Sequence, residues 1–145
     1  MTPFLWFTGT QAEEAARYYV SVFKQGSKVT RTNPMTTSFV LRGQHFVALN
    51  GNRDQPFNDS YSTYVDCKTQ KEVDALWARL IGDGGRETMC GWLKDKYGLS
   101  WQIVPAVLPQ LLGAKNRKKA QAAINLMMTM KKLDGPALQR EFDEA

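Results

Sequence analysis

The sequence contains two copies of one module, and this repeat constrains the fold more than any other feature. The segment TQAEE at residues 10–14 recurs as TQKEV at residues 69–73, and a helix-like stretch follows in each copy. A strand-like segment precedes each helix, PFLWF in the first copy and YSTYV in the second, and further strand-like segments come after it. The sequence therefore predicts two βαβββ units.

Both predicted helices are amphipathic. Apolar residues recur at helical spacing in the first helix at Ala12, Ala15, Ala16, Tyr19, Val20 and Phe23, and in the second at Val73, Leu76, Trp77 and Leu80. Thr10 with Glu13, and Thr69 with Glu72, have the spacing of N-terminal capping boxes. We expect each helix to cover one face of its sheet, so that the opposite, concave faces enclose a cavity.

Residues 90–105, CGWLKDKYGLSWQIVP, predict a β-hairpin. The strand GWLK leads into a tight turn from Asp95 to Gly98, and the strand LSWQIVP follows. Gln102 is a polar residue between Trp101 and Ile103 in an otherwise apolar strand. Because a buried amide must be hydrogen-bonded or used in binding, Gln102 indicates where a site would lie.

This hairpin, with PFLWFTG, EEAARYY, FVALNG and KEVDALWARL upstream, resembles the vicinal oxygen chelate superfamily of glyoxalase and bleomycin-resistance proteins. Within it the chain is similar to the PhnB-like subfamily, which is often labelled 3-demethylubiquinone methyltransferase-like. The resemblance implies an α+β fold whose two βαβββ modules form a curved, partly open mixed sheet around a cavity. We expect a glyoxalase-like domain over residues 1–105, with modules at about 1–55 and 56–105, and a helical C-terminal extension over 106–145.

The resemblance also locates where metal ligands would fall. Metal-binding members use His, Gln or Glu side chains on the concave strands, and the corresponding positions here are near Thr2, at Val47 or Ala48, near Ser60, and at Gln102. Only Gln102 can coordinate, and one neutral amide is a poor ligand for a divalent cation. We therefore expect no metal site, which argues against metal-dependent lyase, isomerase or dioxygenase chemistry.

Strand alternation groups the candidate ligand-binding residues. The concave faces should carry Phe4, Trp6, Ser62, Tyr64, Ser100 and Gln102. His45, the only histidine, alternates with Val47 and should lie at the rim, either as a general base or as a strand-end residue bonded to the backbone. Aromatic walls with a few polar groups are typical of small-molecule sites, and ordinary core packing is the alternative for these rings.

The resulting functional hypothesis is a small-molecule-binding protein that lacks a metal and forms a homodimer. One alternative is an enzyme acting on a small organic substrate, either a metal-assisted lyase or isomerase or the quinone methyltransferase of the subfamily label. Another is a protein that sequesters an antibiotic or toxin. No cofactor is expected, because neither GDGGRE (82–87) nor LNGNRD (49–54) has the glycine spacing of a cofactor-binding loop.

Composition and charge bear on location and partners. Without a long apolar run, no membrane segment is expected, and Cys67 and Cys90 without a signal-peptide pattern favour reduced thiols in the cytoplasm. The net charge is +5, with a basic cluster at Lys115, Arg117, Lys118, Lys119, Lys131 and Lys132. We interpret the cluster as a solvated helix face. Binding of phosphate or nucleic acid is the alternative. Nucleic acid is the less expected of the two, because no aromatic residue interleaves with the charges to form a single-strand stacking platform.

The tail reads as three helices. A short one should cover 108–112, a longer one should be capped by Asn116 and run to Leu133, and a last one should begin near Pro136.

Overall fold

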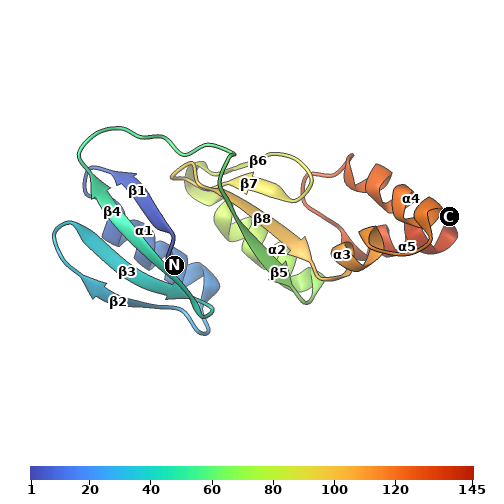
Figure 1. Ribbon diagram of the computed structural model, residues 1–145, viewed down its shortest axis with the longest axis horizontal. Helices are drawn as coiled ribbons and strands as arrows, with labels where there is room; N and C mark the ends of the chain where they lie inside the picture. The colour runs from blue at the N-terminus through green and yellow to red at the C-terminus, as the bar shows by residue number, and fades with distance from the viewer. The chain divides into compact units, whose positions relative to one another are not determined.

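The computed structural model describes residues 1–145 as two compact units, unit 1 over 1–56 and unit 2 over 57–145. Each unit holds a four-stranded mixed sheet with a helix on one face (Figure 1). This confirms the predicted α+β fold with two βαβββ modules. The helices of the C-terminal extension belong to unit 2. None of the helices has the length and apolar character needed to cross a membrane.

Unit 1 follows the predicted order of elements. These are β1 (Phe4–Thr8), α1 (Ala12–Phe23), β2 (Lys28–Thr32), β3 (Thr36–Leu41) and β4 (Gln44–Gly51). The sheet order is β1-β4-β3-β2, with β1 parallel to β4 and the other pairs antiparallel. We call the side of this sheet that lies away from α1 face 1.

Small and aromatic side chains form the core between α1 and its sheet. Ala12, Ala15 and Ala16 are fully buried and let the helix approach closely. Tyr19 stacks on Phe39 of β3, which in turn stacks on Phe46 of β4 with ring centroids 5.4 Å apart. Val22 completes the buried stripe in place of the predicted Val20. Side chains at alternate positions on the same strands therefore point to face 1.

The predicted capping box of α1 is wrong. The helix begins at Ala12, and the Asn50 side chain on β4 accepts a hydrogen bond from the Ala12 amide at 2.9 Å. Glu13 accepts from Arg17 along the helix surface instead of reaching back toward Thr10. Because Asn50 lies on the helix side of its strand, an acceptor from the sheet satisfies the helix terminus, and no local partner is needed.

Unit 2 repeats the arrangement. Its elements are β5 (Ser62–Cys67), α2 (Gln70–Leu80), a short 3₁₀ turn η1 (Gly82–Gly84), β6 (Arg86–Glu87), β7 (Trp92–Lys94) and β8 (Ser100–Pro105), in the sheet order β5-β8-β7-β6. β5 and β8 are parallel. The Thr69 half of the predicted capping box of α2 is confirmed, since the Thr69 hydroxyl accepts from the Glu72 amide at 3.2 Å, and the Glu72 carboxylate accepts from the Lys68 amide at 3.1 Å. Face 2 is the side of this sheet away from α2.

The predicted hairpin is formed by β7 and β8, and Asp95 organises its turn. Asp95 is 2% exposed. Its Oδ1 accepts from the amides of Tyr97 and Leu99 at 2.8 and 3.1 Å, and its Oδ2 accepts from the Trp101 indole at 2.8 Å. Gly98 takes a φ of +84°, a conformation that costs glycine little. One buried carboxylate therefore ties the turn to the core beneath it.

The extension consists of α3 (Val107–Leu112), α4 (Arg117–Met127) and α5 (Gly135–Glu144). Asn116 caps α4 as predicted, accepting from the Lys119 amide. Pro136 stands in the first turn of α5, also as predicted. The helices share an apolar core of Leu108, Leu111, Ala123, Leu133 and Leu138, which includes Val104 at the end of β8.

The predicted end of α4 at Leu133 is wrong. The helix ends at Met127, and the carbonyls of Met130 and Lys131 accept from the amides of Cys90 and Gly91 at 2.8 and 2.7 Å. Leu133 is fully buried in the extension core. Backbone pairing with a distant segment therefore replaces the last helical turns. Local sequence patterns do not reveal this pairing.

Candidate functional site

Three neighbouring strands of unit 2 place an amide between two aromatic rings on face 2. Tyr64 of β5 pairs with Gln102 of β8, and Gln102 pairs with Trp92 of β7. The alternate residues Trp101 and Ile103 are buried on the side of α2. Tyr64 is 49% exposed, while Gln102 and Trp92 are half-buried. We call these residues the Tyr64–Gln102–Trp92 row.

The Gln102 side chain is held by its neighbour. Its Nε2 donates to the Ser62 hydroxyl at 2.9 Å, and Ser62 lies one alternation before Tyr64 on β5. This leaves Gln102 Oε1 as an acceptor and the Ser62 hydroxyl hydrogen as a donor. The pair can therefore orient a ligand that carries both kinds of group.

The adjoining row of face 2 contains a paired charge. Ser100 lies between Ser62 and Lys94 in the sheet, and its hydroxyl donates to Asp59 at 2.7 Å. Lys94 Nζ lies 3.3 Å from the same carboxylate. The Ser100 hydrogen bond and then the Lys94 ammonium lower the pKa of Asp59. At neutral pH this corner of face 2 holds a compensated ion pair.

Tyr64 is a neutral hydrogen-bond donor at physiological pH. Partial burial raises the pKa of its phenol above the ordinary 10.0, and the nearby Asp66 carboxylate and Cys67 add to the effect. Since the neutral form is favoured, the ring and its hydroxyl can contact an apolar or weakly polar ligand without a charge.

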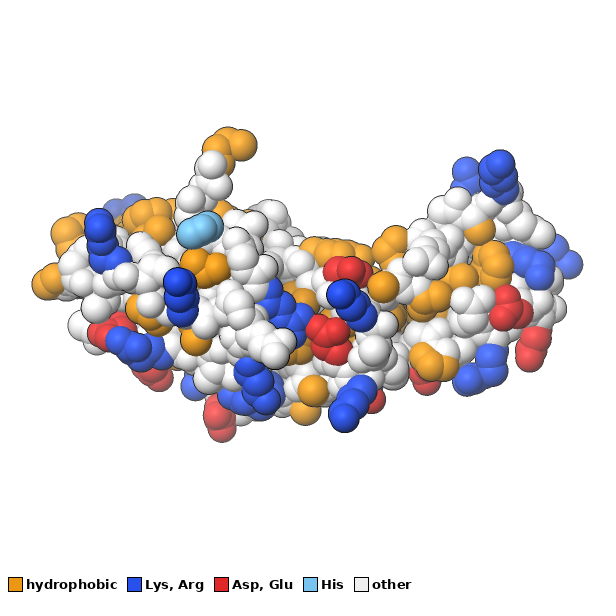
Figure 2. Space-filling model, turned by 90° about the horizontal axis from the view of Figure 1, so that it is seen from below, with side chains coloured by type: hydrophobic (Ala, Val, Ile, Leu, Met, Phe, Trp, Pro, Cys, Tyr) orange, Lys and Arg blue, Asp and Glu red, His pale blue; other side chains and the backbone are white.

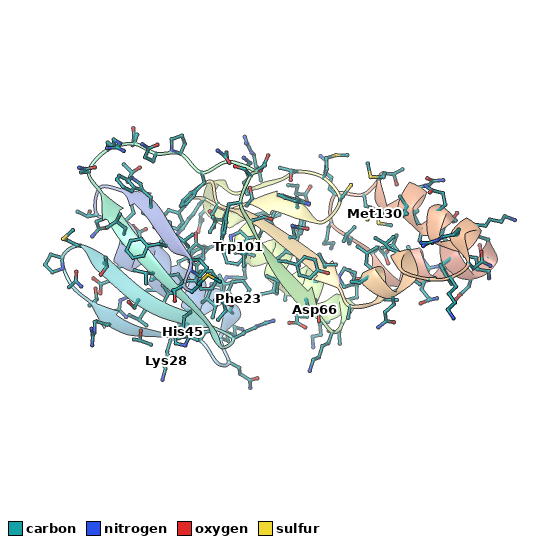
Figure 3. The ribbon with its side chains drawn as sticks, in the orientation of Figure 1. Phe23, Lys28, His45, Asp66, Trp101 and Met130 are labelled. Atoms are coloured by element: carbon teal, nitrogen blue, oxygen red, sulfur yellow. The ribbon has the colours of Figure 1, made fainter.

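Face 1 also carries aromatic side chains. Phe4 and Trp6 of β1 lie beside Val47 and Leu49 of β4, and Phe4 is 59% exposed. His45 of β4 is on the same face by alternation and is exposed (Figure 3). Its side chain makes no hydrogen bond within the chain, so the backbone partner considered for it is not found. No residue of the chain orients this imidazole as a general base.

Trp6 is held by the segment after β4. Its indole N–H donates to the Arg53 carbonyl at 2.9 Å, and the Arg53 guanidinium carbon lies 5.3 Å from the ring centroid. A Cβ on Gly51 would lie 2.0 Å from the Trp6 Nε1. The ring therefore needs a glycine at position 51, and it carries a cation on its surface.

The sequence-predicted residues fall into two groups. Ser62, Tyr64, Ser100 and Gln102 are neighbours on face 2. On face 1, Phe4 and Trp6 are neighbours. His45 lies two residues before Val47, the β4 partner of Phe4, and about 13 Å along the strand from Leu49, the partner of Trp6. It stays a prediction that both groups of residues line one pocket.

Sequence reasoning missed Trp92, Asp59 and Arg53. Trp92 could have been found by pairing the hairpin strands across the turn at Asp95–Gly98, because this register places it opposite Gln102. Asp59 and Arg53 lie outside the strands, where alternation gives no guidance.

The residues at the expected metal-ligand positions do not fit a divalent cation. Val47 is on face 1 and Ala48 is buried on the side of α1, so neither supplies a donor. Thr2 and Ser60 precede their strands, and the Gln102 amide is bonded to Ser62. No group of three or more His, Cys, Asp or Glu side chains is arranged to hold a metal ion.

The fold defines the class of protein. Two open four-stranded sheets, each covered by one helix, make the chain a glyoxalase-like protein of the vicinal oxygen chelate superfamily. The family model for 3-demethylubiquinone-9 3-methyltransferase matches residues 1–104, and the chain belongs to this PhnB-like family. The extension from α3 to α5 lies beyond the matched residues.

Solved structures agree with this assignment. The PhnB protein from Bacillus cereus, which by name is a 3-demethylubiquinone-9 3-methyltransferase, has 33% identity and a TM-score of 0.65, over 73% of this chain and 98% of its own. A glyoxalase-related enzyme from Fulvimarina pelagi (18% identity, TM-score 0.52, covering 72% and 87%) shares the fold. So does a glyoxalase/bleomycin resistance protein/dioxygenase family enzyme from Burkholderia phytofirmans (12%, 0.54, covering 71% and 96%). No curated protein matches the chain.

Proposed function

We propose that this protein binds a small organic molecule with a planar or apolar part, and that it does so without a divalent metal. The Tyr64–Gln102–Trp92 row carries the proposal, because it sets an oriented amide between two accessible rings. Small-molecule sites typically combine apolar walls with a few placed polar groups. Trp6 and Phe4 offer a second aromatic surface on face 1.

The expected binding free energies assign different roles to the aromatic rings and to the Gln102 amide. Covering about 100 Å² of ring is worth about 2.5 kcal/mol before ordering costs, at roughly 25 cal/mol per Å². A hydrogen bond to Gln102 adds only about 1 kcal/mol net, but a wrongly placed ligand would leave that amide unsatisfied. The rings should therefore determine affinity, and Gln102 should determine which ligand is preferred.

Methyl transfer to a quinone is suggested by the family name alone. A methyl donor would need a glycine-rich connection between a strand and a helix, and the β1–α1 and β5–α2 connections hold Gly9 and no other glycine. The segment 82–87 follows α2 and leads to a strand, and 49–54 does not lead to a helix. Sequestration of an antibiotic or toxin needs no such loop and remains the second candidate, favoured by the exposed rings.

A fluorescent neutral probe, N-phenyl-1-naphthylamine, tests the proposal. The protein should bind it, Tyr64→Ala should weaken binding about tenfold, and Gln102→Leu should change the ranking of related amines and phenols. Tyr61→Ala is the matched control, since Tyr61 is also an exposed tyrosine but precedes β5. Absence of probe binding to the folded wild type, or equal effects of the two tyrosine variants, would refute the proposal.

We also propose that the protein forms a homodimer and is located in the cytoplasm. Each sheet has edge strands, β1 and β2 in unit 1 and β5 and β6 in unit 2, and exposed edges favour pairing with another chain. We expect a homodimer by solution scattering at micromolar concentration, and a monomeric mass would contradict it. Neither cysteine forms a disulfide, and reduced thiols are consistent with a reducing compartment.

A further inference from the structure

Face 1 carries an excess of positive charge. Lys28 pairs with Val40 beside His45, and Arg31 pairs with Ser38 beside Val47, so both cations of β2 share the face of Trp6. Figure 2 shows the pale blue imidazole of His45 on a side of unit 1 that also displays blue side chains of Lys and Arg. Arg53 adds a third cation, positioned over Trp6.

Few carboxylates balance these charges. Unit 1 contains Glu13, Glu14 and Asp54 as its acidic residues. The two glutamates are on α1, on the opposite side of the sheet. Asp54 accepts from the Thr8 hydroxyl at the end of β1, and is the one carboxylate on the side of face 1. Lys28, Arg31 and Arg53 form no ion pair within the chain.

Arg53 is the cation best prepared to bind an anion. Its carbonyl is bonded to the Trp6 indole and its guanidinium lies over the same ring, so one aromatic side chain restrains both ends of the residue. Stacking on a ring leaves the in-plane N–H fork available, and that fork matches a carboxylate, phosphate or sulfonate. Because the side chain is already restrained, less rotamer entropy is lost when an anion binds.

We infer that face 1 selects ligands in which an apolar or aromatic body carries an anionic group, with Arg53 as the contact to that group. The Trp6 and Phe4 rings bind the body, and Lys28 and Arg31 attract the charge from the side of β2. This inference rests on the proposed function and deepens it, since it names the class of ligand.

Two fluorescent probes that share a phenylnaphthylamine body test the anion inference separately from the proposed function. N-phenyl-1-naphthylamine is neutral, and 8-anilinonaphthalene-1-sulfonate adds an anionic sulfonate. The wild type should bind the sulfonate probe about tenfold more tightly than the neutral probe, because a bidentate contact between a guanidinium and an anion adds that much affinity. This preference should decrease as the salt concentration rises. Arg53→Gln should abolish the preference by weakening the binding of the sulfonate probe.

Arg17→Gln is the control, because it removes the same charge from the outer surface of α1. Circular dichroism confirms that each variant is folded. Equal binding of both probes by the wild type would overturn the anion inference and leave the proposed function standing. Binding of neither probe would overturn both. A preference that survives Arg53→Gln, or falls equally in Arg17→Gln, would refute the role of Arg53.

Discussion

Face 1 and face 2 belong to two copies of one βαβββ module, and their polar groups differ in kind. Face 1 carries aromatic rings on β1 with Arg53 over Trp6, and it carries Lys28 and Arg31 on β2 at the opposite edge of the sheet. These three cations form no ion pair within the chain. Face 2 places aromatic rings beside the Gln102 amide and a lysine that is neutralised by Asp59. The comparison teaches that the scaffold specifies where side chains point, while the residues at those positions set which ligand chemistry each face can meet.

The largest expected effect concerns the hairpin that presents Gln102. Asp95→Ala removes the acceptor of three hydrogen bonds, from Tyr97, Leu99 and Trp101, and should cost about 3 kcal/mol of unfolding free energy. Urea denaturation measures this loss. Asp66→Ala, which removes an exposed carboxylate from β5, should change stability by less than about 0.5 kcal/mol. Equal losses in the two variants would show that the turn does not depend on Asp95.

A smaller effect should separate face 1 from face 2. Gly51→Ala inserts a Cβ where the Trp6 ring lies, so the ring and Arg53 must move, at a cost of about 1–3 kcal/mol. Binding of the sulfonate probe should weaken, while the indole and amide of face 2 keep their geometry. Gly82→Ala is the control, since its Cβ would meet no atom within 4 Å. Unchanged probe binding in Gly51→Ala would place the site elsewhere.

The two helix starts offer a finer comparison. Asn50→Ala removes the acceptor that β4 provides for the Ala12 amide, and Thr69→Ala removes the local cap of α2. Each should cost about 1 kcal/mol in thermal or urea unfolding. Thr10→Ala should be nearly neutral, because Thr10 does not cap α1. A substantial loss of unfolding free energy in Thr10→Ala would instead show that Thr10 caps α1.

The smallest effect is the titration of Tyr64. Burial and then Asp66 raise its pKa, so the midpoint of its titration should lie above 10.0, as seen by subtracting the absorbance titration of Tyr64→Phe. Because the pKa is raised in the folded chain, this contribution to stability is full below the unfolded pKa and is lost as pH rises through the folded one. The stability of Tyr64→Phe should therefore fall less at alkaline pH. A midpoint at or below 10.0 would contradict the desolvation of face 2.

The strands, the two main helices and the hairpin were predictable because they depend on local periodicity and on a repeat within the chain. Strand alternation likewise identified Ser62, Tyr64, Ser100 and Gln102 as neighbours. The errors involve partners far along the chain: Asn50 at the start of α1, and Met130 and Lys131 bonded to the segment after β6. Arg53 was missed because a loop residue obeys no periodicity, and its position follows from the Trp6 ring.

Gln70, the first residue of α2, should affect which parts of unit 2 unfold together. Its Nε2 donates to the Leu133 carbonyl and its Oε1 accepts from the Gly135 amide, both at 2.9 Å. One side chain thus joins the first turn of α2 to the segment between α4 and α5. In native-state hydrogen exchange, the amides of α5 and of the first turn of α2 should exchange through a shared opening, and Gln70→Ala should let them exchange independently.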